Sequence, residues 1–219
     1  MIIRESNLGY YNIPNDVKDG ICVDIGSNVG SFFSTYHNFF SKIHFYEPFR
    51  DCYQICLEKS KKYNNVSGFN EAVLDQVKDS VSVIGHQDND SGSNAIKYNT
   101  TNSDWNDEEI GSCPSVDLET VLSRVGGSID YLKCDCETSE YNVFYGKDLS
   151  DIKYIAMELH WQMGEEKYYN VLNHILKTHN LVSCNPGDTK YIGHWGGNKE
   201  LFFKNKNLNN YKNISVGIY

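Results

Sequence analysis

An apolar strand that runs through a glycine turn into an apolar helix is the feature that most constrains the fold of this chain. The segment is Ile21-Cys-Val-Asp-Ile-Gly-Ser-Asn-Val-Gly-Ser-Phe32. Gly26 and Gly30 allow backbone angles that other residues avoid, and without a Cβ they let a ligand approach the backbone closely. Such a turn is typical of α/β proteins that bind a nucleotide-like ligand where the first strand ends.

The spacing of the glycines separates two classes of ligand. A dinucleotide fingerprint has Gly-x-Gly-x-x-Gly, because its glycines let the backbone and a helix N-terminus close on a pyrophosphate. This chain has Gly-x-x-x-Gly, accompanied by Asp24 and Asn28. That pattern suits a zwitterionic ligand without phosphate, such as S-adenosylmethionine. It counts against the nearest alternative, a nicotinamide-dependent oxidoreductase.

Strand-like and helix-like runs alternate along the chain, which predicts an α/β fold with a doubly wound, mostly parallel sheet. No linker interrupts them, so we expect a single domain over residues 1–219 with its core at about 20–206. The alternation at 80–85 suggests an added hairpin. We expect strands at 21–26, 42–48, 66–73, 129–135 and 152–160, helices at 31–40, 50–62, 115–125, 141–145 and 165–178, and an antiparallel C-terminal hairpin at 181–184 and 201–204.

Residues 86–113 are rich in Asp, Asn, Ser and Thr. A segment of this length is too long for a simple connector in a compact domain, so it is the best candidate for a lid over a ligand.

The charge of the chain bears on its partners. Its net charge is -9 over 219 residues. Sequence-independent binding to nucleic acid needs clustered Lys and Arg, so we expect no nucleic-acid partner. The acidic and amide-rich loops favour a small-molecule or glycan acceptor instead.

Cysteine use and hydropathy indicate a cytoplasmic location. The chain has 7 cysteines, an odd number that suggests reduced thiols rather than a disulfide framework. The first residues lack the apolar core of a signal peptide. No window approaches the length of apolar sequence that crosses a bilayer, so we expect no membrane partner.

Acidic side chains follow the predicted strands where those strands end. Asp24 closes the first strand, Glu47 the second, Asp135 the strand at 129–135 and Glu158 the strand at 152–160. In open α/β sheets, ligands bind outside the carboxyl ends of the strands. Glu47 lies about twenty residues past the glycine turn, the position from which a carboxylate accepts both ribose hydroxyl protons.

Taken together, these motifs resemble the FkbM-type S-adenosylmethionine-dependent methyltransferase family. The resemblance covers about residues 20–206 and has one departure, Thr138, where the family usually has Gly. The motifs are Val23-Asp-Ile-Gly-Ser-Asn-Val-Gly30, Phe45-Tyr-Glu-Pro48, Asn70-Glu-Ala-Val73, Val116-Asp-Leu-Glu-Thr-Val-Leu122, Ile129-Asp-Tyr-Leu-Lys-Cys-Asp-Cys-Glu137 and Met157-Glu-Leu-His160.

The resemblance implies a class I methyltransferase, Rossmann-like fold with S-adenosyl-L-methionine as cofactor. It places the methionine end of the cofactor over the glycine turn and the ribose on Glu47. It also implies O-methylation of a hydroxyl, commonly on a sugar or natural product. The expected cofactor-binding residues are Asp24, Gly26, Asn28, Gly30, Glu47, Pro48, Asn70, Glu71, Ala72 and Asp135.

The expected catalytic residues are His160, Asp135 and Glu158. His160 is the first choice as general base, since an unperturbed histidine titrates near neutrality. Glu158 lies two residues earlier, on the same side of the strand. Asp135 is the second choice, and His194 in a glycine-rich turn is the third.

Asp135, Glu137 and Glu158 have the oxygen ligands that Mg²⁺ and Ca²⁺ prefer. Lys133 and other basic side chains would pair with the same acids, so the sequence favours no metal ion. A catalytically inactive cofactor-binding module remains a further alternative.

Overall fold

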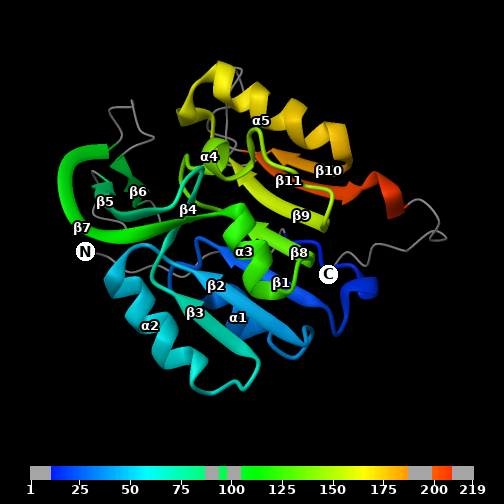
Figure 1. Ribbon diagram of the computed structural model, residues 1–219, viewed down its shortest axis with the longest axis horizontal. Coiled ribbons are helices and arrows are strands. Elements are labelled where there is room, and N and C mark those ends of the chain that lie inside the picture. The colour runs from blue at the N-terminus through cyan, green and yellow to red at the C-terminus, as the bar shows by residue number, and fades with distance from the viewer. Residues whose placement is uncertain (1–10, 87–93, 98–104, 187–198, 209–219) are drawn as a thin grey trace.

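A seven-stranded sheet forms the centre of the computed structural model, which describes residues 11–86, 94–97, 105–186 and 199–208. The strand order is β10-β11-β9-β8-β1-β2-β3 (Figure 1). Only β11 runs opposite to the others, because it pairs antiparallel with both β9 and β10. The strands are β1 (Ile21–Ile25), β2 (Lys42–Tyr46), β3 (Val66–Phe69), β8 (Ile129–Cys134), β9 (Ile152–Leu159), β10 (His179–Pro186) and β11 (Lys199–Asn205).

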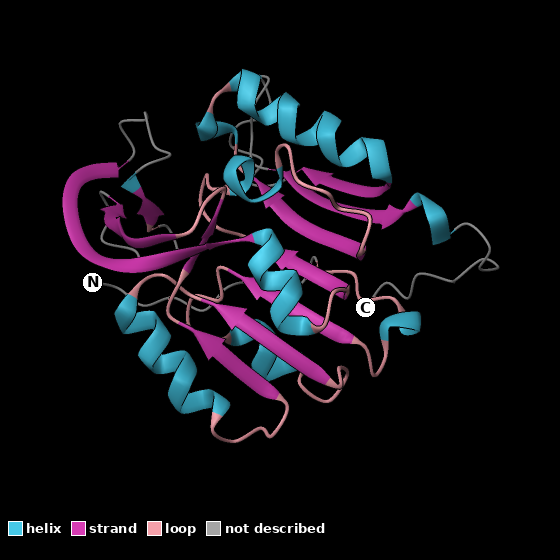
Figure 2. Ribbon diagram, viewed as in Figure 1, coloured by secondary structure: helices cyan, strands magenta, loops and turns pink. Residues whose placement is uncertain are grey.

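Helices cover both faces of this sheet (Figure 2). Phe32 and Phe33 of α1 (Ser31–Tyr36) and Cys56 of α2 (Arg50–Ser60) pack in one buried cluster. The opposite face is covered by α3 (Leu118–Val125), α4 (Glu140–Phe144) and α5 (Glu165–Thr178), whose apolar side chains share a second cluster. The predicted doubly wound sheet and antiparallel C-terminal hairpin are confirmed. None of the described helices combines the length and the apolar character needed to cross a bilayer.

Among the described residues, short 3-10 helices are η1 (Asn15–Val17), η4 (Trp161–Met163) and η6 (Lys206–Leu208).

A second sheet of four strands adjoins the first, in the order β4-β7-β5-β6. It contains β4 (Ala72–Leu74), β5 (Lys78–His86), β6 (Ala95–Ile96) and β7 (Trp105–Asp117). The prediction of one strand over 66–73 is therefore wrong, because the chain leaves the central sheet after Phe69. The side-chain amide of Asn70 donates to the carbonyls of Glu47 and Pro48, which holds the chain at this point and directs it into β4.

Part of the predicted lid is a strand. Residues 105–113 belong to β7, which pairs antiparallel with β5. Backbone pairing across the sheet stabilises this polar stretch, although its sequence has few of the residues that favour strands. Residues 87–93 and 98–104 lie outside the described part of the chain.

Helix α1 is shorter than the predicted 31–40, because the carbonyls beyond its end accept hydrogen bonds from a side chain. The amide of Asn65 donates to the carbonyl of His37 at 2.7 Å and to that of Phe40 at 2.8 Å. Helix α3 begins at Leu118 rather than at 115, since Asp117 caps it by accepting a bond from the Thr120 N–H.

Candidate functional site

The glycine turn is held against the ends of two neighbouring strands. The Gly26 N–H donates to the carbonyl of Tyr46 at 3.0 Å. Gly26 has a φ of 76°, and a Cβ at this position would collide with the backbone carbonyl of Asp135. Gly30, with a φ of 77°, is the N-cap residue of α1. The turn therefore requires glycine at Gly26 and lies in contact with the end of β8.

Glu47 closes the turn from the side of β2. Its carboxylate accepts the Asn28 N–H at 2.7 Å and the Phe49 N–H at 2.9 Å. Burial raises the pKa of Glu47 to about 8, although both backbone bonds favour its ionised form. A carboxylate has about four lone-pair sites, so two remain to accept bonds from hydroxyl groups.

Asp24 and Lys133 form an ion pair beneath the turn. Lys133 Nζ lies 3.1 Å from Asp24 Oδ1 and donates to the carbonyl of Gly26 at 2.5 Å. Burial acts to lower the pKa of Lys133, but the carboxylates of Asp24 and Asp135 outweigh it and raise that pKa above its usual value. The structure thus gives Asp24 a supporting position under the turn.

The other expected cofactor-binding residues surround Glu47. Asn70 holds the carbonyls of Glu47 and Pro48. Glu71 pairs with both terminal nitrogens of Arg124, whose guanidinium lies 4.5 Å from the centre of the Phe69 ring. Ala72 is buried in β4. Glu71 is therefore already engaged by a bidentate partner.

His160 is the centre of a group of carboxylates. Its side chain is 1% exposed, and its Nδ1 lies 2.8 Å from Glu140 Oε1. Its Nε2 lies 3.2 Å from Glu137 Oε2 and 3.9 Å from Glu158 Oε1. Burial acts to lower the pKa of His160, but Glu140 and Glu137 outweigh it and raise that pKa well above its usual value.

Glu140 was not among the residues expected from the sequence. It begins the short helix α4 and is completely buried. Its partner His160 follows twenty residues later, on another element. In the sequence, Glu140 is only an acid three residues after Glu137. Its role becomes visible through the contact with His160, which the sequence does not show.

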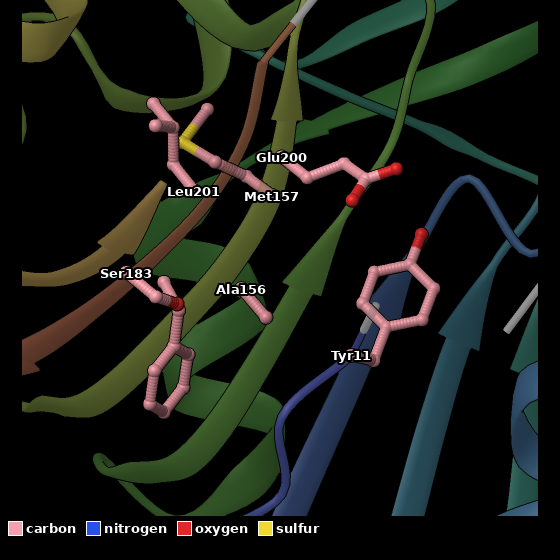
Figure 3. Close-up of a pocket in the computed structure, with 7 residues that line it drawn as sticks. Tyr11, Ala156, Met157, Ser183, Glu200 and Leu201 are labelled. Atoms are coloured by element: carbon pink, nitrogen blue, oxygen red, sulfur yellow. The ribbon is translucent and has the colours of Figure 1, made fainter. Parts of the chain in front are cut away.

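Asp135 is partly exposed and connects the turn with a hollow beside β9 and β11. The hydroxyl of Tyr11 donates to Asp135 Oδ2 at 3.2 Å. In Figure 3 the Tyr11 hydroxyl and the Glu200 carboxylate lie on the same side of this hollow. Its lining residues are Tyr11, Ala156, Met157, Ser183, Glu200, Leu201 and Phe202. Tyr11 and Glu200 were not singled out from the sequence, and His194 lies outside the described residues.

The backbone between Asp135 and α4 is left-handed at two residues. Glu137 has a φ of 49° and Thr138 a φ of 74°. Thr138 stands where the resembled family usually has Gly, and the position does take up the conformation that glycine adopts most easily. The threonine at this position therefore carries backbone strain that glycine would not.

We compared the chain with known protein families and with solved structures, and one family model matches its sequence. The model of the methyltransferase FkbM domain matches residues 24–182. No curated protein sequence matches the chain significantly. A crystal structure of methyltransferase FkbM from Methylobacillus flagellatus is similar, with 12% identity and a TM-score of 0.53. The alignment covers 84% of this chain but only 43% of that one, so the chain spans less than half its length.

Other solved structures share the arrangement more distantly. An rRNA methylase from Streptococcus thermophilus has 7% identity and a TM-score of 0.47, over 87% of this chain and 90% of its own. The N-methyltransferase NodS from Bradyrhizobium japonicum, in complex with S-adenosyl-L-homocysteine, has 9% identity and a TM-score of 0.43, over 85% of this chain and 78% of its own.

Proposed function

The chain belongs to the FkbM methyltransferase family, and from this premise we propose that it methylates a hydroxyl group of a small molecule or glycan. Membership of this family supports a methyltransferase with S-adenosyl-L-methionine as cofactor. It counts against the nicotinamide-dependent oxidoreductase. The hydroxyl acceptor, the residues of the site and a cytoplasmic location are our proposals.

The residues at the ends of β1 and β2 fit this cofactor. Within the turn, Gly26 and Asn28 are partly exposed, and Glu47 keeps lone pairs for the two ribose hydroxyls. We assign Asn28 and Pro48 to the same site because both border Glu47. Asp24 supports the turn through Lys133 rather than facing the ligand.

One observation carries the proposal: the glycine turn packs directly against the backbone of Asp135. A ligand on this turn therefore lies next to the Asp135 carboxylate, which is partly exposed and already accepts a bond from the Tyr11 hydroxyl. Bringing two reactants together in the right orientation contributes as much as about 7–11 kcal/mol to lowering a barrier.

When bound, the cofactor would supply a methyl group attached to a positively charged sulfur. Transfer forms a bond from the acceptor oxygen to the methyl carbon, and the electron pair of the broken C–S bond stays on the sulfur. The acceptor hydroxyl must lose its proton in this process. We propose Asp135 as the base that takes it. General-base assistance of this kind is worth about 10²- to 10⁴-fold in rate.

His160 was the first choice as base from the sequence, but its surroundings favour a positioning role. Both of its ring nitrogens face carboxylates, Nδ1 at 2.8 Å and Nε2 at 3.2 Å, so neither is open to a proton from an acceptor hydroxyl. A histidine engaged in this way orients Glu137 and Glu140. Glu158, 3.9 Å from His160, extends the same group.

The hollow next to Asp135 suits a hydroxyl-rich acceptor. It presents Tyr11, Ser183 and Glu200 together with apolar surface from Ala156 and Leu201. Hydroxyl groups donate to carboxylates, whereas a phosphate backbone is repelled by them. Glu200 lies directly opposite Glu158 in the antiparallel register, which concentrates negative charge there. This charge supports an uncharged, polyhydroxylated acceptor over RNA.

Calorimetric titration tests the cofactor site. Wild type should bind S-adenosylhomocysteine and S-adenosylmethionine but not NAD, and Glu47→Gln should weaken binding at least tenfold. The control Glu58→Gln removes an exposed acid that is paired with Lys61, and should bind as wild type does. Binding of NAD, or equal binding by Glu47→Gln, would overturn the assignment of the turn.

Formation of S-adenosylhomocysteine with a panel of sugars and other hydroxyl compounds then tests the acceptor class. Asp135→Asn should lower kcat about 10²- to 10⁴-fold while cofactor affinity changes little. Turnover only with amines or RNA would overturn the proposal of a hydroxyl acceptor. Cofactor binding without turnover would favour an inactive binding module.

A further inference from the structure

We propose that Asp135, Glu137 and His160 bind a divalent metal ion that accepts both imidazole and carboxylate ligands. Each of these residues offers one ligand atom, and the three atoms lie within 4.8 Å of one another. They come from the ends of β8 and β9, which are neighbours in the central sheet. One ion can therefore reach all three.

The first argument is the orientation of His160. Its Nδ1 lies 2.8 Å from Oε1 of Glu140, a completely buried acid. With the Nδ1 proton donated to Glu140, the lone pair of Nε2 points toward Glu137. Metal-binding histidines almost always donate their other N–H to a carboxylate or a carbonyl in this way. Glu140 would therefore not bind the ion itself but would orient the ligand His160.

The second argument is the balance of charge. His160 faces the carboxylates of Glu137 at 3.2 Å and Glu140 at 2.8 Å. Lys133, which the sequence suggested as a partner for Glu137, is committed to Asp24 and to the carbonyl of Gly26. Within the described residues, Oε2 of Glu140 is buried and lacks a hydrogen-bond partner. A divalent cation on Nε2 would compensate this excess of negative charge, which a single imidazolium does not.

These contacts change the interpretation reached from the sequence. There, Lys133 was expected to pair with the acids and to make a metal ion unnecessary, and Glu158 was considered as a ligand. The structure directs Lys133 to Asp24 and gives the third position to His160.

An imidazole nitrogen with two carboxylates suits Mn²⁺ or Zn²⁺ better than Ca²⁺, which prefers six to eight oxygen ligands. Three protein ligands also leave positions on the ion for water or an acceptor oxygen.

Metal binding itself does not depend on the acceptor, and only its catalytic consequence rests on the proposed function. A metal ion bound here would have Asp135, the proposed base, among its ligands. Coordination to the ion lowers the pKa of a bound oxygen group, so an acceptor hydroxyl would give up its proton more readily.

The test is uptake of Mn²⁺ by the full chain after treatment with a chelator, measured from the electron paramagnetic resonance signal of free Mn²⁺. We expect one ion per chain at micromolar concentration, undiminished by a tenfold excess of Ca²⁺. Glu137→Gln should weaken uptake more than about tenfold, and Glu140→Gln by about 10–100-fold. The control Glu119→Gln removes an exposed acid paired with Lys147 and should leave uptake unchanged.

His160→Ala should abolish uptake, and circular dichroism would show whether this buried substitution still folds. If it does not, Glu137→Gln decides the question, because that side chain is 19% exposed. Absence of uptake by wild type, displacement by Ca²⁺, or equal uptake by Glu137→Gln would overturn the proposal. S-adenosylhomocysteine affinity of the metal-free protein is measured in parallel, so failure of the cofactor site and failure of the metal site give different results.

Discussion

Lys133 and Asp24 lie side by side on neighbouring parallel strands, with Nζ 3.1 Å from Oδ1 and side-chain exposures of 4% and 0%. The lysine also donates to the carbonyl of Gly26. One buried cation thus joins strand β8, strand β1 and the glycine turn, and fixes the turn relative to Asp135.

Removing the cation of this pair should destabilise the fold strongly. Lys133→Met leaves the Asp24 carboxylate buried without a counter-charge, which costs about 3–5 kcal/mol. The double variant Lys133→Met with Asp24→Asn removes both charges and should recover most of that loss. Urea denaturation measures each free energy of unfolding. A single variant as stable as wild type would show that Asp24 is compensated elsewhere.

Substitution of Gly26 should destroy the turn. Gly26→Ala places a Cβ against the Asp135 carbonyl at a φ of 76°, so we expect loss of S-adenosylhomocysteine binding and more than about 3 kcal/mol of stability. Gly126→Ala is the matched control, because Gly126 has a φ of 94° but open space around it. It should cost only about 1–2 kcal/mol and leave binding intact. Equal losses in both variants would contradict the role given to the collision.

Thr138→Gly should stabilise the protein. Thr138 is a buried, β-branched residue at a φ of 74°, and its hydroxyl lacks a partner among the described residues. Glycine relieves both penalties, but its greater freedom in the unfolded chain lowers stability. We expect a net gain of about 1 kcal/mol in the free energy of unfolding. Thr138→Ala keeps the left-handed strain but removes the hydroxyl. If thermal denaturation shows the same gain for both variants, strain is not the cause.

His44 should make the fold sensitive to acid. Burial, with lesser contributions from Lys42 and Arg124, lowers the pKa of His44 to about 4. The unfolded chain therefore binds more protons than the folded one between about pH 6.5 and pH 4. The free energy of unfolding should fall as the pH drops through this window.

His44→Phe tests this contribution, because the phenyl ring replaces a side chain that already lies 5.5 Å from the Phe69 ring. Urea denaturation at pH 7 and pH 4 should show a smaller loss for the variant than for wild type. His179, whose pKa burial also lowers to about 4, keeps part of the acid sensitivity in the variant. An unchanged difference between the two pH values would exclude His44 as a cause.

The parts of the site that the sequence predicted are those fixed by local chemistry. The glycine turn and the acids Glu47 and Asp135 follow from residues at the ends of strands, and parallel strands bring those ends to one edge of the sheet. Their place at this edge followed once the strands had been identified, whereas the order of the strands was not predicted.

The parts that were missed depend on contacts between distant segments. Glu140 acquires its meaning from His160, and Tyr11 from Asp135, more than a hundred residues away. The polar residues of β7 form a strand because β5 pairs with them, which no periodicity in that stretch indicates. The role proposed for His160 also changed from general base to positioning residue. Its neighbours Glu137 and Glu140 lie beyond the end of a different strand, so the sequence around His160 does not show them.

The hollow beside Asp135 lies partly outside the segment that the family model covers. Tyr11 precedes residues 24–182, and Glu200 and Phe202 follow them. A fragment trimmed to the shared segment would keep the glycine turn and His160 but lose a wall of the hollow and the strand β11 that pairs with β9. If the hollow holds the acceptor, as we propose, residues near both ends of the chain are the place to redesign selectivity, and the shared middle is best left untouched.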